Sequence, residues 1–268
     1  MNEHDKYIIK NYFETTDKPH LCFDLDGTLV QDSNIEQVCL DILQFFMNSG
    51  FSISIATGRS FMEAWELLEL IKPNADSALY DGQLTFCYKE KQFKQNIKFN
   101  FCEYNDLLVE MNDYTPGTVE EYLTQYQFSS NRIKRLFELS FRLYETPEFQ
   151  LRYEILNCVY MAVPVIKSEK DQFFKKLDEF QGHILKVEKH GSCWIKIAPK
   201  NVCKATAFGK EVGSMMCFGN GANDFEILSK SKVKVVMANS NPCLRQIQDA
   251  IELKESLPEF LLEMIRLL

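Results

Sequence analysis

Short apolar runs alternate with amphipathic helical segments near the start of the chain, and this alternation constrains the fold more than any other feature of the sequence. Residues 20–25 and 51–56 are apolar runs bounded by polar residues, as expected of buried strands. Residues 35–47 and 61–71 carry apolar side chains at helical spacing. This order of strand, helix, strand and helix predicts βαβ units built around a parallel sheet.

The two helical segments have recognisable start and stop signals. Ser33 or Asn34 is expected to cap the first of them, and Gly50 to follow its last turn. Pro73 follows the second segment and prevents its continuation. A further short strand is expected at 77–80.

The alternation stops at the turn signal Asp81-Gly82 and resumes near residue 202. Between these points the expected elements are a hairpin at 83–88 and 92–99, strands near 156–163, 183–189 and 192–198, and a helix at 168–180. Beyond them the expected elements are a helix from about Val202, strands at 214–218 and 232–237, and helices at 223–230 and from Leu257.

One domain is therefore expected to be inserted into another. The fold class is α/β, with a Rossmann-like doubly wound parallel sheet formed by residues 1–82 and 200–268. An α+β domain formed by residues 83–199 interrupts it. A chain of 268 residues has room for two such units.

Composition narrows the class of partner and the compartment. The net charge of −8 disfavours non-specific binding to nucleic acid or to anionic membranes. The nine cysteines form no CxxC pair and no metal-binding spacing, so reduced thiols are expected. The first ten residues are charged, and no apolar stretch approaches the length of a membrane span. We therefore expect a cytoplasmic protein, and its oligomeric state stays open.

Two carboxylates follow the first predicted strand. Asp24 and Asp26 are two residues apart, a spacing that can turn both side chains to the same side. Ligands of doubly wound α/β folds bind outside the carboxyl ends of the strands. An active site is therefore expected here, although an Asp-x-Asp pair can also simply begin a turn.

The segment FDLDGTLV at 23–30 resembles the first motif of the haloacid dehalogenase superfamily of phosphotransferases. The resemblance implies that Asp24 is a nucleophile that forms an aspartyl-phosphate, which splits phosphoryl transfer into two displacements. It also implies that Asp26 is the acid/base that protonates the leaving alcohol and later activates water.

The segment ATGRS, which follows the second strand, occupies the place of the superfamily's second motif. The resemblance implies that Thr57 is a catalytic residue whose hydroxyl contacts the transferring phosphoryl group. Gly58 and Arg59 would join it in binding the substrate. Thr57 could instead cap the next helix, and Arg59 could pair with an acidic group.

The segment IKIAPKNVCKATAF at 195–208 is similar to the third motif of the Cof-like branch, in which a lysine opens a helix. This position implies that Lys204 is catalytic and also holds the phosphate. The helix dipole does not favour a cation at a helix start, which supports a role in the site over that of a solvated surface lysine.

The segment FGNGANDFEIL at 218–228 resembles the superfamily's metal motif, with Asn220 where many relatives carry Asp. The resemblance implies a Mg²⁺ site formed by Asp24, the backbone carbonyl of Asp26, and Asn220 or Asp224, partly through water. Asn223 is expected to bind substrate. The alternative is a turn that only caps the next helix.

The order of the motifs, with the long insert between the second and the third, resembles the Cof-like subgroup with a type IIB cap. It implies a Mg²⁺-dependent phosphatase for a small phosphorylated metabolite such as a sugar phosphate, a nucleotide or a cofactor phosphate. Two alternatives stay open. A phospho-ligand-binding regulatory protein is suggested by Asn220, and a phosphomutase would use the same nucleophile.

Overall fold

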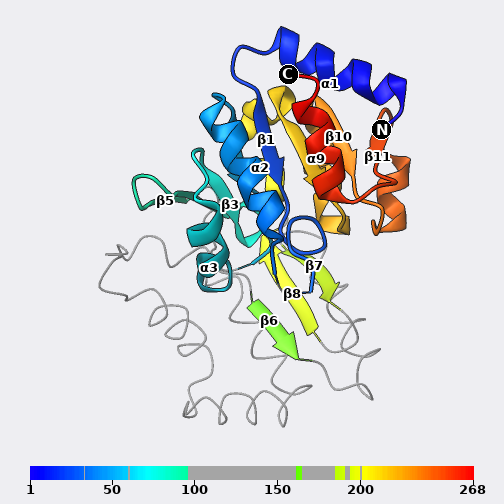
Figure 1. Cartoon of the computed structure of the whole chain (residues 1–268). Helices are drawn as coiled ribbons and strands as arrows, with labels where there is room; N and C mark the ends of the chain where they lie inside the picture. The colour runs from blue at the N-terminus through cyan, green and yellow to red at the C-terminus, as the bar shows by residue number, and fades with distance from the viewer. Residues whose placement is uncertain (33, 60, 96–160, 165–184, 191–193, 200) are drawn as a thin grey trace, which may run out of the picture. The chain divides into compact units, whose positions relative to one another are not determined.

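Five parallel strands form the central sheet of the chain (Figure 1). Their spatial order is β11 (Ile251–Glu252), β10 (Val233–Val236), β9 (Met216–Gly219), β1 (His20–Phe23) and β2 (Ser52–Ile55). The structure is a computed structural model that describes the whole chain except residues 33, 60, 96–160, 165–184, 191–193 and 200. The predicted parallel α/β sheet is confirmed.

Two units divide the chain: Met1–Asn96 together with Cys203–Leu268, and Ile97–Val202. In the first unit the α-helices are α1 (Glu3–Thr15), α2 (Gln37–Asn48), α3 (Phe61–Ile71), α8 (Phe225–Lys230) and α9 (Leu257–Ile265). Its 3-10 turns are η1 (Tyr80–Gly82), η3 (Lys204–Ala207), η4 (Gly209–Ser214), η5 (Ala222–Asp224) and η6 (Pro242–Gln246). Helices α2 and α9 lie side by side against the sheet (Figure 1).

The core lies where the buried residues of the strands meet the apolar faces of these helices. Phe23 of β1 and Phe218 of β9 stack with ring centroids 4.3 Å apart, and Phe260 of α9 meets Phe218 edge-on. Leu43 and Phe46 of α2 are fully buried. This packing fixes the strands at whose carboxyl ends the polar loops begin.

The helix predicted at 35–47 begins two residues later than expected. Glu36 precedes its first residue and makes no side-chain capping bond. Asn34, one of the two expected caps, instead pairs through its backbone with Gln31, and Ser33 lies outside the described residues. The capping prediction is therefore wrong for Asn34, because a local backbone bridge uses this residue.

Three further differences concern elements with a weak local signal. Helix α1 and the two-residue strand β11 were not predicted. The helix expected from Val202 is replaced by the two 3-10 turns η3 and η4, the second of which begins at Gly209 with a left-handed φ of 55°. A residue in that conformation cannot continue a right-handed helix.

The predicted hairpin is present as β4 (Leu84–Cys87) and β5 (Gln92–Gln95), and β3 (Ser77–Leu79) pairs with β4 in the same antiparallel sheet. An aromatic cluster joins this hairpin to α3, since Phe86 and Phe93 lie 5.1 and 4.8 Å from Phe61 between ring centroids. The first unit accordingly extends to Asn96, beyond the boundary expected after residue 82.

In the second unit the described residues form a three-stranded antiparallel sheet. Its order is β6 (Met161–Pro164), β8 (Trp194–Pro199) and β7 (Leu185–His190), close to the three strands expected in the insert. The helix expected at 168–180 lies outside the described residues.

Two sequence expectations about thiols and membranes can be compared with the described ranges. The six cysteines there are free, and Cys22, Cys39 and Cys217 among them are buried. No helix in these ranges is both long enough and apolar enough to cross a membrane.

His20, at the start of β1, makes the stability of the fold depend on pH. Its Nε2 lies 2.7 Å from Oγ of Ser54, which donates its own proton to the carbonyl oxygen of Asp76, so Nε2 is the donor. Burial lowers the pKa of His20 from 6.5 to about 4, against a smaller opposing effect of the Asp76 carboxylate. The unfolded chain therefore takes up a proton before the folded chain does, and stability falls as pH falls through this window.

We expect His20 to remove about 2 kcal/mol from the free energy of unfolding between pH 7 and pH 5. Urea unfolding at the two pH values measures this loss. Between pH 7 and pH 5, the free energy of unfolding of the His20→Gln variant should fall by about 2 kcal/mol less than that of the wild-type protein. The His4→Gln variant, changed at an exposed position of α1, should behave like the wild-type protein. Equal losses in the His20→Gln variant and the wild-type protein would contradict the assignment.

Candidate active site

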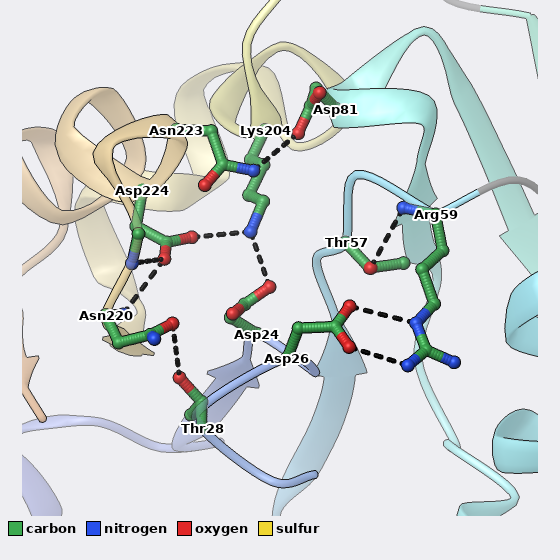
Figure 2. Close-up of polar contacts among 11 residues, drawn as sticks. Asp24, Asp26, Thr28, Thr57, Arg59, Asp81, Lys204, Asn220, Asn223 and Asp224 are labelled. Carbon is green, nitrogen blue, oxygen red and sulfur yellow. Dashed lines mark hydrogen bonds and ion pairs between the residues drawn. The ribbon is translucent and has the colours of Figure 1, made fainter. Parts of the chain in front are cut away.

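The polar residues singled out in the sequence gather at the carboxyl ends of β1, β2 and β9 (Figure 2). Asp24 directly follows β1, and its backbone N–H donates to the carbonyl oxygen of Phe218 on β9. Thr57 comes two residues after the end of β2, and Asp224 ends η5, which follows β9. Parallel neighbouring strands therefore bring segments that are distant in sequence to one edge of the sheet.

Lys204 joins two of these segments. Its Nζ donates to Oδ1 of Asp24 at 2.5 Å and to Oδ1 of Asp224 at 2.6 Å (Figure 2). The lysine side chain is 1% exposed, so the ammonium is removed from water and depends on these carboxylates. The alternative that Lys204 is a solvated surface lysine is wrong.

Burial and the neighbouring charges shift the pKa values of Asp24 and Lys204. Burial raises the pKa of Asp24 to about 7, and the Asp224 carboxylate adds to this, while Lys204 and the Leu25 backbone N–H act in the opposite direction. Burial alone would lower the pKa of Lys204, but the two carboxylates outweigh it and raise the pKa. Lys204 is therefore charged, and Asp24 is a carboxylate that the folded chain holds against the cost of desolvation.

Asp224 is held on both sides. Its Oδ1 accepts from Lys204, and its Oδ2 accepts from the backbone N–H groups of Asn220 and Gly221 at 3.0 and 2.8 Å. The loop between β9 and η5 therefore folds around this carboxylate. Asp224 orients Lys204 toward Asp24.

Asp26 lies at the exposed side of the site, where it forms an ion pair with Arg59. Nε and one terminal nitrogen of Arg59 donate to the two carboxylate oxygens of Asp26 at 2.9 and 2.6 Å (Figure 2). The pKa of Arg59 is raised, chiefly by these hydrogen bonds. The Asp26 side chain remains 56% exposed. Of the two alternatives for Arg59, the structure contains the acidic pairing.

Thr57 is fully buried, and its hydroxyl oxygen accepts from the backbone N–H of Arg59 at 3.1 Å. This bond spans two residues and stabilises the loop after β2. A hydroxyl that accepts one hydrogen bond still has a proton to donate. The hydroxyl therefore stabilises the loop instead of capping α3, which begins at Phe61, and it keeps a proton that a phosphoryl oxygen could accept.

Asparagine side chains tie the loops of the site together. The hydroxyl of Thr28 donates to Oδ1 of Asn220 at 3.4 Å, and Nδ2 of Asn239 donates to the carbonyl oxygen of Gly27 at 3.1 Å. Both contacts hold the loop that carries Asp24 and Asp26 against the loops after β9 and β10.

One buried residue of the site was missed in the sequence. Asp81 is 3% exposed, and its Oδ1 accepts from Nδ2 of Asn223 at 2.9 Å (Figure 2). Its Asp-Gly dipeptide indicated a turn, but a turn signal carries no information about which distant side chain the carboxylate meets. Its place directly after a strand, like that of Asp24, was the available signal.

The oxygen donors of the site fit Mg²⁺ in kind. Mg²⁺ prefers oxygen ligands and commonly uses only one or two protein carboxylates. Asp24, the backbone carbonyl of Asp26 and the carboxamide of Asn220 supply such oxygens, and two buried carboxylates face a single ammonium. In the described part of the chain, no three His, Cys, Asp or Glu side chains gather as a metal-binding group.

The fold and this set of side chains define a haloacid dehalogenase-like hydrolase. Residues 21–256 match the family of that description, and since this is most of the chain, the protein belongs to the family.

Similar proteins have low sequence identity but cover nearly the whole chain. A phosphoglycolate phosphatase from Staphylothermus marinus is 22% identical over 242 residues, covering 87% of this chain and 91% of its own. A haloacid dehalogenase-like hydrolase structure from Bacteroides thetaiotaomicron has a TM-score of 0.70 at 14% identity, covering 92% of this chain and 100% of its own. A HAD/COF-like hydrolase structure from Plasmodium vivax has a TM-score of 0.65 at 16% identity, covering 96% and 99%.

Proposed function

We propose that the chain is a Mg²⁺-dependent phosphatase that hydrolyses a small phosphorylated metabolite through an aspartyl-phosphate on Asp24. The observation that carries the proposal is the buried cluster in which Lys204 bridges Asp24 and Asp224. It holds a carboxylate at the carboxyl end of β1, an interior strand of the sheet, where ligands of this fold class bind. The haloacid dehalogenase-like family and the loops around this cluster support the same reaction.

In the first step an oxygen of Asp24 attacks phosphorus, and the bond from phosphorus to the leaving oxygen breaks. Asp26 donates a proton to that leaving oxygen. In the second step the Asp26 carboxylate takes a proton from water as the water oxygen attacks phosphorus. The bond between phosphorus and Asp24 breaks, which releases inorganic phosphate and restores the Asp24 carboxylate and the protonated carboxyl group of Asp26.

The neighbouring residues position these two carboxylates. Lys204 holds Asp24 in place and offsets negative charge that builds up at the transferring group. The planar fork of Arg59 orients Asp26 at the exposed side of the site, where a substrate would enter. Thr57, Gly58 and the carboxamide of Asn223 would contact the phosphoryl oxygens.

Asp24, the Asp26 carbonyl and Asn220 are the residues that would hold Mg²⁺ directly. Asp224 would act through a water, because both of its oxygens already accept hydrogen bonds. When bound, the cation would supply charge neutralisation at the phosphoryl oxygens.

The substrate is best sought with a panel rather than a single compound. We would measure phosphate release from phosphoglycolate, sugar phosphates, nucleotides, cofactor phosphates and 4-nitrophenyl phosphate, with Mg²⁺ and with chelator. Mg²⁺-dependent release from at least one compound is expected. No release from any of them would favour a phospho-ligand-binding protein, which the neutral Asn220 suggests, and transfer of phosphate back to the organic product would favour a mutase.

Asn220→Asp is expected to lower the Mg²⁺ concentration needed for half-maximal activity, because it adds a negative charge to the proposed metal site. Titrating Mg²⁺ against phosphate release measures this midpoint. Asn11→Asp makes the same change of charge at an exposed position of α1 and should leave the midpoint where it is. An unchanged midpoint in Asn220→Asp would exclude Asn220 from the metal shell.

A further inference from the structure

The turn η1 has a costly backbone conformation. Tyr80, Asp81 and Gly82 have φ values of 50°, 52° and 91°, so three consecutive residues lie in the left-handed region. Glycine adopts this region freely, and aspartate adopts it more readily than most residues, but a bulky residue such as Tyr80 loses roughly 1–2 kcal/mol there. Such strain persists only where surrounding contacts enforce it, and it concentrates at functional sites.

The contacts that enforce this conformation come from the loop after β2. The backbone N–H of Tyr80 donates to the carbonyl oxygen of Arg59, and that of Asp81 donates to the carbonyl oxygen of Thr57, both at 3.0 Å. The turn is thereby fastened to the two residues of this loop that belong to the site.

The side chain of Asp81 reaches a second loop of the site. Its Oδ1 accepts from Nδ2 of Asn223, which lies 142 positions later in the chain. A carboxylate only accepts hydrogen bonds, so the NH₂ group of Asn223 faces Asp81. The carboxamide oxygen is directed toward Gly221, where a Cβ atom would lie 2.5 Å from it. Asp81 therefore selects one of the two orientations of the Asn223 amide.

The packing around Asp81 leaves no room for a side chain at Gly58 or at Gly82. A Cβ atom on Gly58 would lie 2.9 Å from Oδ1 of Asp81 and 3.4 Å from Nδ2 of Asn223. A Cβ atom on Gly82 would lie 2.1 Å from the carbonyl oxygen of Cys203, the residue before Lys204. The turn thus touches the segments that carry Thr57, Lys204 and Asn223.

A buried carboxylate is a poor choice for stability alone. Taking it out of water costs free energy that hydrogen bonds only partly return, and an apolar residue of similar size is often better tolerated. At Asp81 this cost coincides with a strained backbone. What the carboxylate does accomplish is to hold the Asn223 amide in one orientation beside Gly58.

We propose that Asp81 is a positioning residue that orients the Asn223 carboxamide and holds it against the loop after β2, so that both loops contact the phosphoryl group of the substrate together. The inference rests on the proposed phosphatase function, and it adds to it a residue that acts through Asn223 rather than on the substrate.

Two substitutions at Asp81 separate the effect of its hydrogen bond to Asn223 from the effect of its backbone conformation. Asp81→Gly removes the carboxylate but tolerates the left-handed conformation, and we expect a loss in kcat of roughly 10- to 100-fold, the size that misplacement of a substrate contact produces. Asp81→Asn also tolerates that conformation and keeps an oxygen that accepts from Asn223, so activity within about threefold of wild type is expected. Asp249→Gly is the matched control, because Asp249 is an exposed aspartate with φ of 58°. It should leave kcat unchanged.

A double-mutant cycle tests whether Asp81 acts through Asn223. The variant that combines Asp81→Gly with Asn223→Ala should be no less active than Asn223→Ala alone. Multiplied losses would overturn the proposal, as would full activity of Asp81→Gly or equal damage by Asp81→Asn and Asp81→Gly. Thermal unfolding of each variant shows whether a loss of activity reflects a loss of fold.

A spectroscopic measurement separates the failure of this inference from the failure of the proposed function. In nitrogen-15 NMR spectra without substrate, the side-chain NH₂ signal of Asn223, assigned with Asn223→Ala, should move in Asp81→Gly and move less in Asp81→Asn. A protein that releases no phosphate but shows these shifts would refute the phosphatase and keep the alignment. A signal that stays in place in Asp81→Gly would refute the alignment whatever the activity.

Discussion

Asp24→Asn is expected to lower phosphate release roughly 10⁴-fold or more, as the loss of an attacking nucleophile does in other enzymes. The amide is nearly isosteric with the carboxylate, so the surrounding loops have no steric reason to move. It is a poor nucleophile toward phosphorus. Steady-state kinetics with the best substrate of the panel measures the loss.

The same variant should be at least as stable as the wild-type protein in the absence of metal. Burial and Asp224 raise the pKa of Asp24 from 3.8 to about 7, so the ionised group is disfavoured in the folded chain relative to the unfolded chain. Above pH 3.8 this difference reduces stability, and a neutral Asn removes it. Urea unfolding at pH 8 checks the expectation.

Asp32→Asn is the matched control for Asp24→Asn. Asp32 is exposed and has a left-handed φ of 47°, which Asn also tolerates, so the same chemical change is made a few residues away. Its kinetics should match those of the wild-type protein. Phosphate release by Asp24→Asn at a wild-type rate, from preparations free of other phosphatases, would refute the nucleophile assignment.

Lys204→Met is expected to damage both activity and stability. Removal of the ammonium leaves the carboxylates of Asp24 and Asp224 buried without their shared partner. Breaking a buried ion pair from one side typically costs about 3–5 kcal/mol. We expect a loss of that size in the free energy of unfolding, together with a loss of phosphate release of at least about 10³-fold.

Two comparisons show whether the loss has this electrostatic origin. Lys210→Met changes an exposed lysine of η4 and should leave stability within about 0.5 kcal/mol of wild type. Combining Lys204→Met with Asp224→Asn removes one carboxylate along with the ammonium, so part of the lost stability should return. A double variant less stable than Lys204→Met would show that packing around the methylene chain, not charge, dominates.

The regular elements could be predicted where a local period carries the signal. Helix α3 spans Phe61–Ile71 as its apolar spacing indicates, and the parallel strands β1, β2, β9 and β10 fall within a few residues of the predicted runs. Helix α1 could not be predicted in this way, because only Ile9 and Tyr12 of it are buried and they leave little apolar period to detect. The turns η3 and η4 depend on backbone conformation at Gly209, which spacing does not reveal.

The sequence by itself determined the kind of site and the loops that carry it, because residues that directly follow parallel strands must share one edge of the sheet. Asp24 and Asp26 could be placed there on that basis, whereas Thr57 and Asp224 were assigned from the resemblance of their segments to motifs of the haloacid dehalogenase superfamily. Their roles in catalysis remain predictions that the variants above test.

Only the tertiary structure decided which polar groups pair. Lys204 bridges Asp24 and Asp224, which lie 180 and 20 positions away, and Arg59 grips Asp26 across 33 positions. Asp81 meets Asn223 across 142 positions. Sequence spacing fixes the distance between side chains only within one helix or strand. Between segments, the pairing depends on how the loops pack and which carboxylate oxygen they leave facing a donor.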